Sequence, residues 1–200
     1  MRHRAALSVT LTGLLFMPGV SQAHLVNTGL GPIYDGISHL FVSIEDLLPV
    51  VAIALLAGLN GADAGRRMVI ALPLSWLAGG MAGVLLPYAS LVVPPAAVSL
   101  LVLGVLTAVD LKIAPLGIMA LSLVLGLVHG WRNGVAILDA EVSAVGLVGI
   151  TGAVFVVATL VSALAASANL TWTRVVMRVV GSWIGATGLL LVGWTLSGRL

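Results

Sequence analysis

Six long apolar stretches, separated by short polar segments, make up most of this chain. They lie near residues 38–59, 68–87, 94–110, 113–130, 143–166 and 175–197. A helix needs about 20 mostly apolar residues to cross the hydrocarbon core of a bilayer. Only 8% of the 200 residues are charged, against roughly 25% in a soluble domain, so most of the exterior must face lipid. The sequence therefore predicts an all-α fold, a polytopic membrane bundle of about six transmembrane helices over residues 24–200.

Residues 1–23 have the three parts of a secretory signal peptide. Arg2 and Arg4 give a positive start, residues 5–17 are an apolar run, and Ser21-Gln22-Ala23 is a small-x-small cleavage site. The apolar run is shorter than a full transmembrane span. Cleavage would leave His24 at the mature N-terminus, and the alternative is an uncleaved first helix.

The basic residues favour one orientation of the bundle, because cytoplasmic loops carry an excess of Lys and Arg. With the mature N-terminus outside, five basic residues fall in or beside cytoplasmic loops and two fall on the outer side. The five are Arg66, Arg67, Lys112, Arg174 and Arg178, and the two are Arg132 and Arg199. We therefore expect a multi-pass protein of the bacterial inner membrane with both ends outside.

The composition excludes several classes of protein. The chain has no cysteine, which removes disulfides, thiolate metal sites, iron–sulfur clusters and thiol catalysis. Its nine Lys and Arg residues are dispersed, unlike a nucleic-acid surface, and there is no Walker A or His-Glu-x-x-His motif. The serines within the spans have no base nearby in sequence; they are Ser75, Ser99, Ser122, Ser162 and Ser182. We therefore predict no enzyme and no tightly bound cofactor.

The first span carries four ionisable residues, Asp35, His39, Glu45 and Asp46. On a continuous helix Asp35 and His39 share a face, and Asp46, seven residues after His39, falls on the same stripe. Glu45 lies about 100° away, toward a neighbouring helix. A central carboxylate costs a membrane helix roughly 2.5–3.5 kcal/mol and normally faces a bundle interior on an ion or substrate path. The alternative for Asp35 and His39 is a place in the headgroup region, where they cap the helix.

His129 ends the fourth predicted span, on the outer side, where the first span begins. Imidazoles and carboxylates are the ligands expected for Ni²⁺, Co²⁺ or Zn²⁺. A histidine at a helix end is also typical of an interfacial residue. A mature N-terminal His24 would add its α-amine as a chelating group, and the alternative is a chance residue after the cleavage site. We predict six metal ligands: His24, Asp35, His39, Glu45, Asp46 and His129.

Two stretches resemble the HupE/UreJ family of small nickel/cobalt permeases, and specifically its more divergent branch. The first span of that family carries His-Pro-x-x-Gly-x-Asp-His, and here the corresponding stretch is His39-Leu40-Phe41-Val42-Ser43-Ile44-Glu45-Asp46. The first His is kept, Glu45 stands for Asp, and Asp46 stands for the second His. The fourth span of the family carries Phe-His-Gly-x-Ala-x-Glu. Here Val128-His129-Gly130-Trp131-Arg132-Asn133-Gly134 keeps the His-Gly, has Gly134 in place of Glu, and adds a charge at Arg132.

The resemblance implies a secondary permease for nickel or cobalt, which captures the ion at the outer face and passes it by Glu45 and Asp46. The alternative is a non-transporting accessory protein for maturation of a hydrogenase or urease-type metalloenzyme, which Gly134 and Arg132 favour. Acids along a continuous path would indicate transport, and acids that stop at the outer surface would indicate the accessory role. The expected partners are the divalent metal ion, the lipid bilayer, nickel metalloenzymes as a functional link, and further copies of the chain, since the 24 glycines suit close helix packing.

Overall fold

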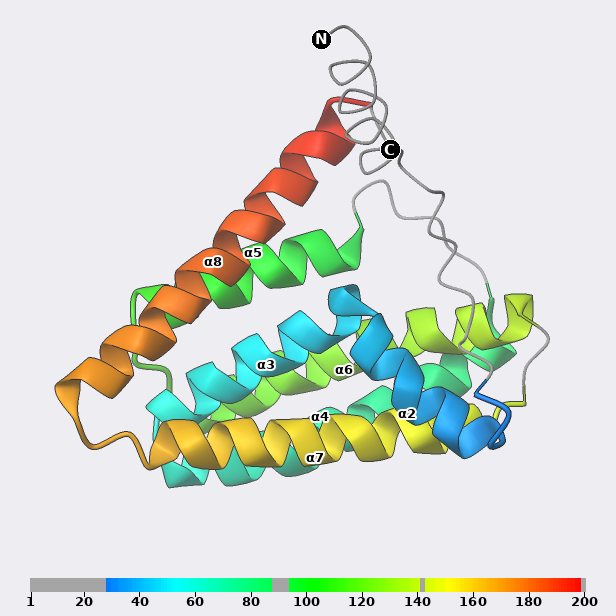
Figure 1. Ribbon diagram of the computed structural model, residues 1–200, viewed down its shortest axis with the longest axis horizontal. Helices are drawn as coiled ribbons and strands as arrows, with labels where there is room; N and C mark the ends of the chain where they lie inside the picture. Colours follow the sequence, from blue (N-terminus) through cyan, green and yellow to red (C-terminus); the bar gives the residue numbers. More distant parts are fainter. Residues whose placement is uncertain (1–27, 88–93, 141–142, 199–200) are drawn as a thin grey trace, which may run out of the picture.

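The computed structural model describes residues 28–87, 94–140 and 143–198. Within these ranges the secondary structure is helical and contains no strand, which confirms the all-α prediction. The helices are α2 (Pro32–Val42), α3 (Ile44–Leu59), α4 (Ala62–Leu85), α5 (Pro95–Ala108), α6 (Pro115–Asp139), α7 (Gly146–Ala166) and α8 (Thr171–Leu196). In Figure 1, α3, α4, α6 and α7 run side by side, and α8 crosses obliquely over α5. The predicted signal peptide and His24 lie outside the described residues.

Among the described residues, four helices are long and apolar enough to cross a membrane by themselves: α4, α6, α7 and α8. α2 and α3 together would form a fifth span, broken by a bend of 74°. α5 has 14 residues, which is about 21 Å of helix and shorter than a bilayer core of about 30 Å. The helices indicate a multi-pass membrane protein, and the count of six spans stays a prediction.

The first predicted span, 38–59, is interrupted at Ser43. This residue alone separates α2 from α3, and its backbone is extended (φ −82°, ψ 90°). Its N–H still bonds the carbonyl of His39 at 2.8 Å, and its own carbonyl accepts the N–H of Asp46 at 3.0 Å. Serine is a favoured residue at the start of a helix. The single helical stripe expected for Asp35, His39 and Asp46 is therefore not formed, because the chain turns between the last two.

Small residues bring α4 and α6 into close contact. Gly130 and Gly134 lie four residues apart on one face of α6. A Cβ added to Gly130 would meet the backbone carbonyl of Trp76 on α4, and one added to Gly134 would meet the carbonyl of Gly80. Backbones that approach this closely are typical of membrane helices packed through small residues. The contact fixes which side of α6 faces the interior of the bundle.

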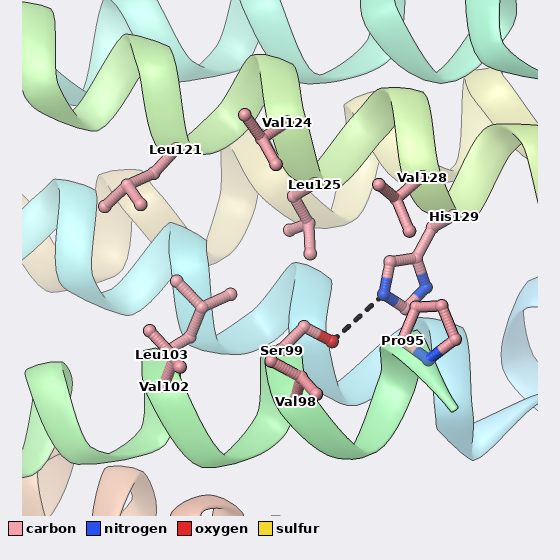
Figure 2. Close-up of a pocket in the computed structure, with 10 residues that line it drawn as sticks. All are labelled: Pro95, Val98, Ser99, Val102, Leu103, Leu121, Val124, Leu125, Val128 and His129. Carbon is pink, nitrogen blue, oxygen red and sulfur yellow. Dashed lines mark hydrogen bonds between the residues drawn. The ribbon is translucent and has the colours of Figure 1, made fainter. Parts of the chain in front are cut away.

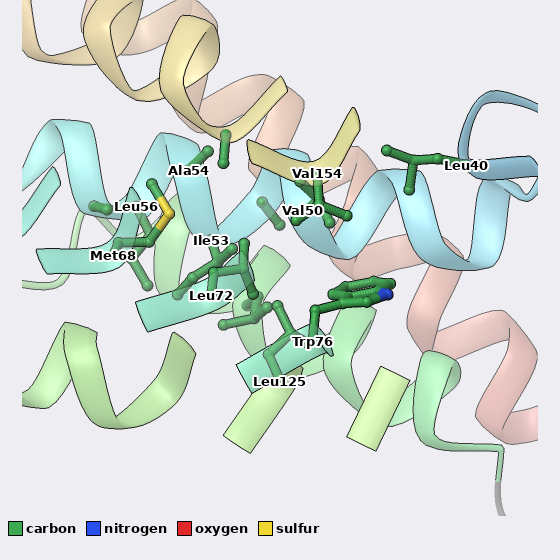
Figure 3. Close-up of a cluster of buried hydrophobic side chains, with 14 of the residues drawn as sticks. Leu40, Val50, Ile53, Ala54, Leu56, Met68, Leu72, Trp76, Leu125 and Val154 are labelled. Atoms are coloured by element: carbon green, nitrogen blue, oxygen red, sulfur yellow. The ribbon is translucent and has the colours of Figure 1, made fainter. Parts of the chain in front are cut away.

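The main apolar cluster lies between α3, α4, α6 and α7 (Figure 3). Ile53 and Leu56 of α3 pack there with Leu72 and Trp76 of α4, and all four are fully buried. After Asp46, every buried residue of α3 is apolar. The face that α3 itself buries beyond Asp46 is therefore apolar.

Three loops meet at the C-terminal end of α3. The Asn60 side chain donates to the carbonyl of Leu111 at 3.1 Å and accepts the N–H of Ile113 at 2.9 Å. The carbonyl of Leu59 accepts a hydrogen bond from Arg174, at the start of α8, at 3.4 Å. The loops that follow α3, α5 and α7 are thus joined, and they are the three loops predicted to face the cytoplasm.

Asp110 is the acid of this loop cluster. Arg174 donates to both of its carboxylate oxygens, at 2.8 and 3.0 Å, and Lys112 donates to one of them at 2.9 Å. Burial acts to raise the pKa of Asp110, but the hydrogen bonds and positive charges of Arg174 and Lys112 outweigh it, so the pKa lies below its usual value. Lys112 also donates to the carbonyl of Leu59 at 3.3 Å. The three loops are therefore held together by ion pairs as well as by hydrogen bonds to backbone carbonyls.

Candidate functional site

Asp46 is buried in the first turn of α3, with 3% of its surface exposed. Three side chains contact its carboxylate: His129 Nδ1 at 2.8 Å, Asn133 Nδ2 at 2.8 Å and Ser43 Oγ at 3.2 Å. The N-terminus of α3 adds the positive end of its helix dipole. An ionised carboxylate only accepts hydrogen bonds, so these surroundings suit a negative charge. The break at Ser43 thus places a carboxylate inside the bundle.

His129 lies within α6 and is fully buried. The fourth span was expected to end near 130, but α6 continues to Asp139. The interfacial alternative therefore does not apply to this residue. While Nδ1 contacts Asp46, Nε2 lies 3.0 Å from Ser99 Oγ on α5. The ring also lies beside that of Trp76, with centroids 5.5 Å apart and planes tilted by 32°. His129 thus connects α6 to α3, α4 and α5.

Asn133 lies one turn after His129 and is also buried. Its amide nitrogen donates to Asp46, and its amide oxygen accepts the indole N–H of Trp76 at 3.2 Å. With one partner for each end, the amide has a single satisfactory orientation. Asn133 therefore holds the carboxylate of Asp46 against α6.

His39 reaches the same carboxylate from α2. It is buried, and its Nε2 lies 3.7 Å from Asp46 Oδ2, which is longer than a hydrogen bond. Although the helix bends between them, the two residues remain neighbours. The predicted proximity of His39 and Asp46 is therefore observed, across a break and not along one helix.

The other predicted ligands lie apart from this group. Asp35 accepts the N–H and the hydroxyl of Thr28, both at 2.6 Å, at the start of α2. These bonds tie Asp35 to the segment that precedes α2, whose N-terminus has no side-chain cap, so the helix-capping alternative is not observed for Asp35. Glu45 is 58% exposed at its side chain and pairs with Arg132 at 2.9 Å. Glu45 thus stands at the edge of the site, one residue before the buried Asp46.

The buried polar group has a limited set of metal-binding side chains. Among the residues that the structure describes, no set of three or more His, Asp or Glu side chains is arranged to hold a metal ion. His129 and His39 approach different oxygens of Asp46. The predicted six-ligand set therefore stays a prediction, and the chemistry on hand is that of a buried carboxylate linked to an imidazole.

A groove of about 510 Å³ lies between α5 and α6 and ends at His129 and Ser99 (Figure 2). The other lining residues are apolar: Pro95, Val98, Val102, Leu103, Leu121, Val124, Leu125 and Val128. In Figure 2 the Ser99 hydroxyl points from α5 toward the imidazole on α6. The groove thus has one polar end, formed by these two side chains.

Sequence reasoning missed Ser99, Asn133 and Trp76. Ser99 was set aside because no base lies near it in sequence, yet His129, 30 residues away, lies against it across two helices. Asn133 carries a usable signal, because a residue four positions after His129 shares its helix face. Trp76 has no such signal, and only the packing of α4 on α6 identifies it.

Residues 11–191 match a known protein family, described as HupE / UreJ protein. The chain belongs to the HupE/UreJ family. No curated protein and no solved structure gave a significant match. In this HupE/UreJ protein, the two stretches that resemble the family motifs, 39–46 and 128–134, meet inside the bundle through the contact of Asp46 with His129.

Proposed function

We propose that this HupE/UreJ protein is a secondary permease that carries a divalent transition metal, nickel or cobalt, across the bacterial inner membrane. The observation that carries the proposal is Asp46, a buried carboxylate at a break in an apolar segment, bonded to His129. Ionisable residues inside membrane helices are costly and mark ion or proton paths. Broken helices whose ends face the transported ion recur in secondary transporters.

The chemistry of the side chains agrees with nickel or cobalt as the substrate. Imidazole suits Ni²⁺, Co²⁺ and Zn²⁺, whereas thiolate and thioether ligands select softer ions. The chain has no cysteine, and the buried group offers His39, His129 and the carboxylate of Asp46. A borderline dication is therefore the best match to these residues.

The proposed entry is the end of the bundle where Glu45 is exposed. Arg132 holds the Glu45 carboxylate at 2.9 Å, so an incoming dication competes with a guanidinium for this first acid. Asp46 follows directly in sequence and is buried. With this end facing outward, the membrane potential attracts the ion inward by about 2.3 kcal/mol per charge per 100 mV, which supplies a driving force without ATP.

One observation favours the second candidate, a non-transporting accessory protein for maturation of a metalloenzyme. Beyond Asp46, the buried residues of α3 are all apolar, and most of them belong to the cluster in Figure 3. With the N-terminus outside as proposed, the acids of α3 stop in the outer part of the bundle. A permease must open a polar route past this cluster, whereas a metal-binding accessory protein has no need of one.

Ser99, His129 and Asp46 are connected in the order of the hydroxyl, imidazole and carboxylate of an acyl-transfer triad. We nevertheless propose a binding role for them. The chain belongs to the HupE/UreJ family, and the resemblance to that family implies a permease or an accessory protein. The imidazole–carboxylate pair is equally a common arrangement around protein-bound metals.

Uptake of radioactive nickel and cobalt tests the proposal. Cells expressing wild type, His39→Ala, His129→Gln and the remote Asp63→Asn are compared with an empty vector at matched expression. We expect saturable uptake by wild type and Asp63→Asn and its loss in both histidine variants. Uptake at the level of the empty vector, by inserted protein that still binds Ni²⁺ after purification, contradicts transport and supports the accessory role. If the wild type neither takes up nor binds nickel or cobalt, both candidates are contradicted.

A further inference from the structure

The two ring nitrogens of His129 have different surroundings. Nδ1 lies 2.8 Å from the carboxylate of Asp46, which as an ionised group can only accept, so Nδ1 carries the hydrogen. Nε2 is then the nitrogen with a free lone pair. Histidines that bind metals in proteins commonly donate their other N–H to a carboxylate, which fixes the tautomer and raises the basicity of the ring. Asp46 therefore orients His129, and an ion bound by this ring lies on Nε2.

Nε2 is directed at Ser99, and the Ser99 hydroxyl faces two acceptors at equal distance. Its Oγ lies 3.0 Å from Nε2 and 3.0 Å from the carbonyl of Ala96. A hydroxyl has one hydrogen to donate, so one of the two contacts lacks a hydrogen whenever His129 is neutral with its proton on Nδ1. A cation bound to both Nε2 and the Oγ lone pairs removes the conflict, because the hydroxyl hydrogen then goes to Ala96.

We propose that Ser99 is a ligand of the transported cation, paired with Nε2 of His129 at the polar end of the groove between α5 and α6. This inference rests on the proposed function and adds a residue that belongs to neither motif stretch. The 3.0 Å separation of Oγ and Nε2 is close to the ~2.9 Å expected for two ligands at right angles around an ion that lies about 2.0–2.1 Å from each. The two ligand atoms thus lie close enough to share one ion once the Ser99 hydroxyl turns out of line with the Nε2 lone pair.

The lining residues of the groove other than Ser99 and His129 are apolar, so the rest of the coordination is water that the ion keeps. The groove's volume of about 510 Å³ exceeds the share of a single water molecule, about 30 Å³, many times over. Divalent ions held by few protein ligands keep part of their hydration shell. The ion is therefore held by Nε2, Oγ and water, with the negative charge of Asp46 on the far side of the imidazole.

Ser122 provides a matched comparison. It is buried on α6, seven residues before His129 and thus on the same helix face. Its hydroxyl donates to the carbonyl of Ile118 at 2.7 Å, an ordinary contact within the helix. Ser122 is more deeply buried than Ser99, and it serves as the comparison because it is a serine on the helix of His129 that lacks the imidazole partner.

Cobalt spectroscopy on cysteine variants tests the ligand role, because the chain has no cysteine of its own. Full-length wild type, Ser99→Cys and Ser122→Cys are purified in detergent, checked for matching elution as folded protein, and titrated with Co²⁺. We expect Co²⁺ binding by all three and an intense near-ultraviolet sulfur-to-cobalt charge-transfer band in Ser99→Cys alone. In a separate titration, Ser99→Ala is expected to weaken Co²⁺ binding about tenfold, the equivalent of about 1.4 kcal/mol.

These results distinguish a failure of the Ser99 ligand role from a failure of the proposed function. If wild type and Ser99→Cys bind Co²⁺ but the band is absent, or is equally strong in Ser122→Cys, Ser99 is not a ligand and the proposed function stands. If the wild type binds no Co²⁺ or Ni²⁺, the proposed function fails and the ligand role fails with it. A band confined to Ser99→Cys supports both.

Discussion

Replacing Asp46 with asparagine removes one negative charge and almost no volume. Asp46 contacts Nδ1 of His129 at 2.8 Å, so an ion on the opposite ring nitrogen lies about 7 Å from the carboxylate, given a metal–nitrogen distance of about 2.0 Å. At an effective dielectric constant of about 20, a dication and a carboxylate at that distance attract by about 5 kcal/mol. The variant Asp46→Asn should therefore bind Ni²⁺ or Co²⁺ roughly 3,000-fold more weakly.

The same substitution should leave the fold intact. Charge-assisted hydrogen bonds from His129 and Asn133 contribute about 1.5–3 kcal/mol each, and asparagine keeps only part of that. Against this loss, the variant no longer has to bury a charge, which costs several kcal/mol. Because the two effects have opposite signs and similar size, the free energy of unfolding should change little.

Isothermal titration of purified protein with Ni²⁺ and Co²⁺ measures the predicted loss. Asp63→Asn is the matched control, because Asp63 forms an exposed pair with Arg67 in the first turn of α4, and its affinity should equal that of the wild type. An Asp46→Asn affinity within tenfold of the wild type, in protein of normal thermal stability, would refute the electrostatic link between Asp46 and the ion.

Three further predictions concern packing, the entrance and pH. Gly130→Ala places a Cβ against the carbonyl of Trp76 and should lower the free energy of unfolding by about 1–3 kcal/mol. Gly152 has open space around it, so Gly152→Ala should be neutral or slightly stabilising in the same unfolding assay. Equal effects of the two substitutions would contradict the tight α4–α6 contact. Arg132→Gln removes the guanidinium that holds Glu45. It should tighten Ni²⁺ binding about tenfold at low salt and less at high salt. An unchanged Ni²⁺ affinity would argue against entry beside this pair. The pKa of Asp110 lies below its ordinary value of 3.8, so its contribution to stability is complete above that pH and is lost as the pH falls through the lowered pKa; thermal unfolding of Asp110→Asn should show a smaller stability loss over that acid range than the wild type.

The sequence predicts the positions of most helices because apolar length and polar punctuation are local properties. The predicted stretches 143–166 and 175–197 correspond closely to α7 and α8. The break at Ser43 was not predictable in the same way, since no proline or glycine marks it, and Asp46 contacts partners 83 and 87 residues away. The fourth stretch was predicted too short because Arg132 and Asn133 resemble a loop in composition. In the structure, both belong to α6.

The candidate site, too, was predictable from the sequence only in part. Asp46 and His129 are recognisable because ionisable groups in apolar segments are costly wherever they pack. Their mutual contact, and the contact of His129 with Ser99, depend on how α3, α5 and α6 assemble. A serine in an apolar helix has no local mark of function, because its hydroxyl can bond its own backbone. Pairwise placement across helices is the information that a single sequence lacks.

The cluster at the end of α3 sets an order on the biogenesis of the protein. The carbonyl of Leu59 belongs to an early helix, yet its donors Lys112 and Arg174 are synthesised 53 and 115 residues later. A helix end has carbonyls without partners inside the helix, so this one relies on water or headgroups until Lys112 is in place, and it gains its second donor only with Arg174. Arrival of α8 then satisfies Leu59 and Asp110 together. α8 therefore completes a set of bonds at the end of α3 that the loop after α5 begins, and a nascent chain that stops before Arg174 leaves Asp110 with Lys112 as its remaining cationic partner among the described residues.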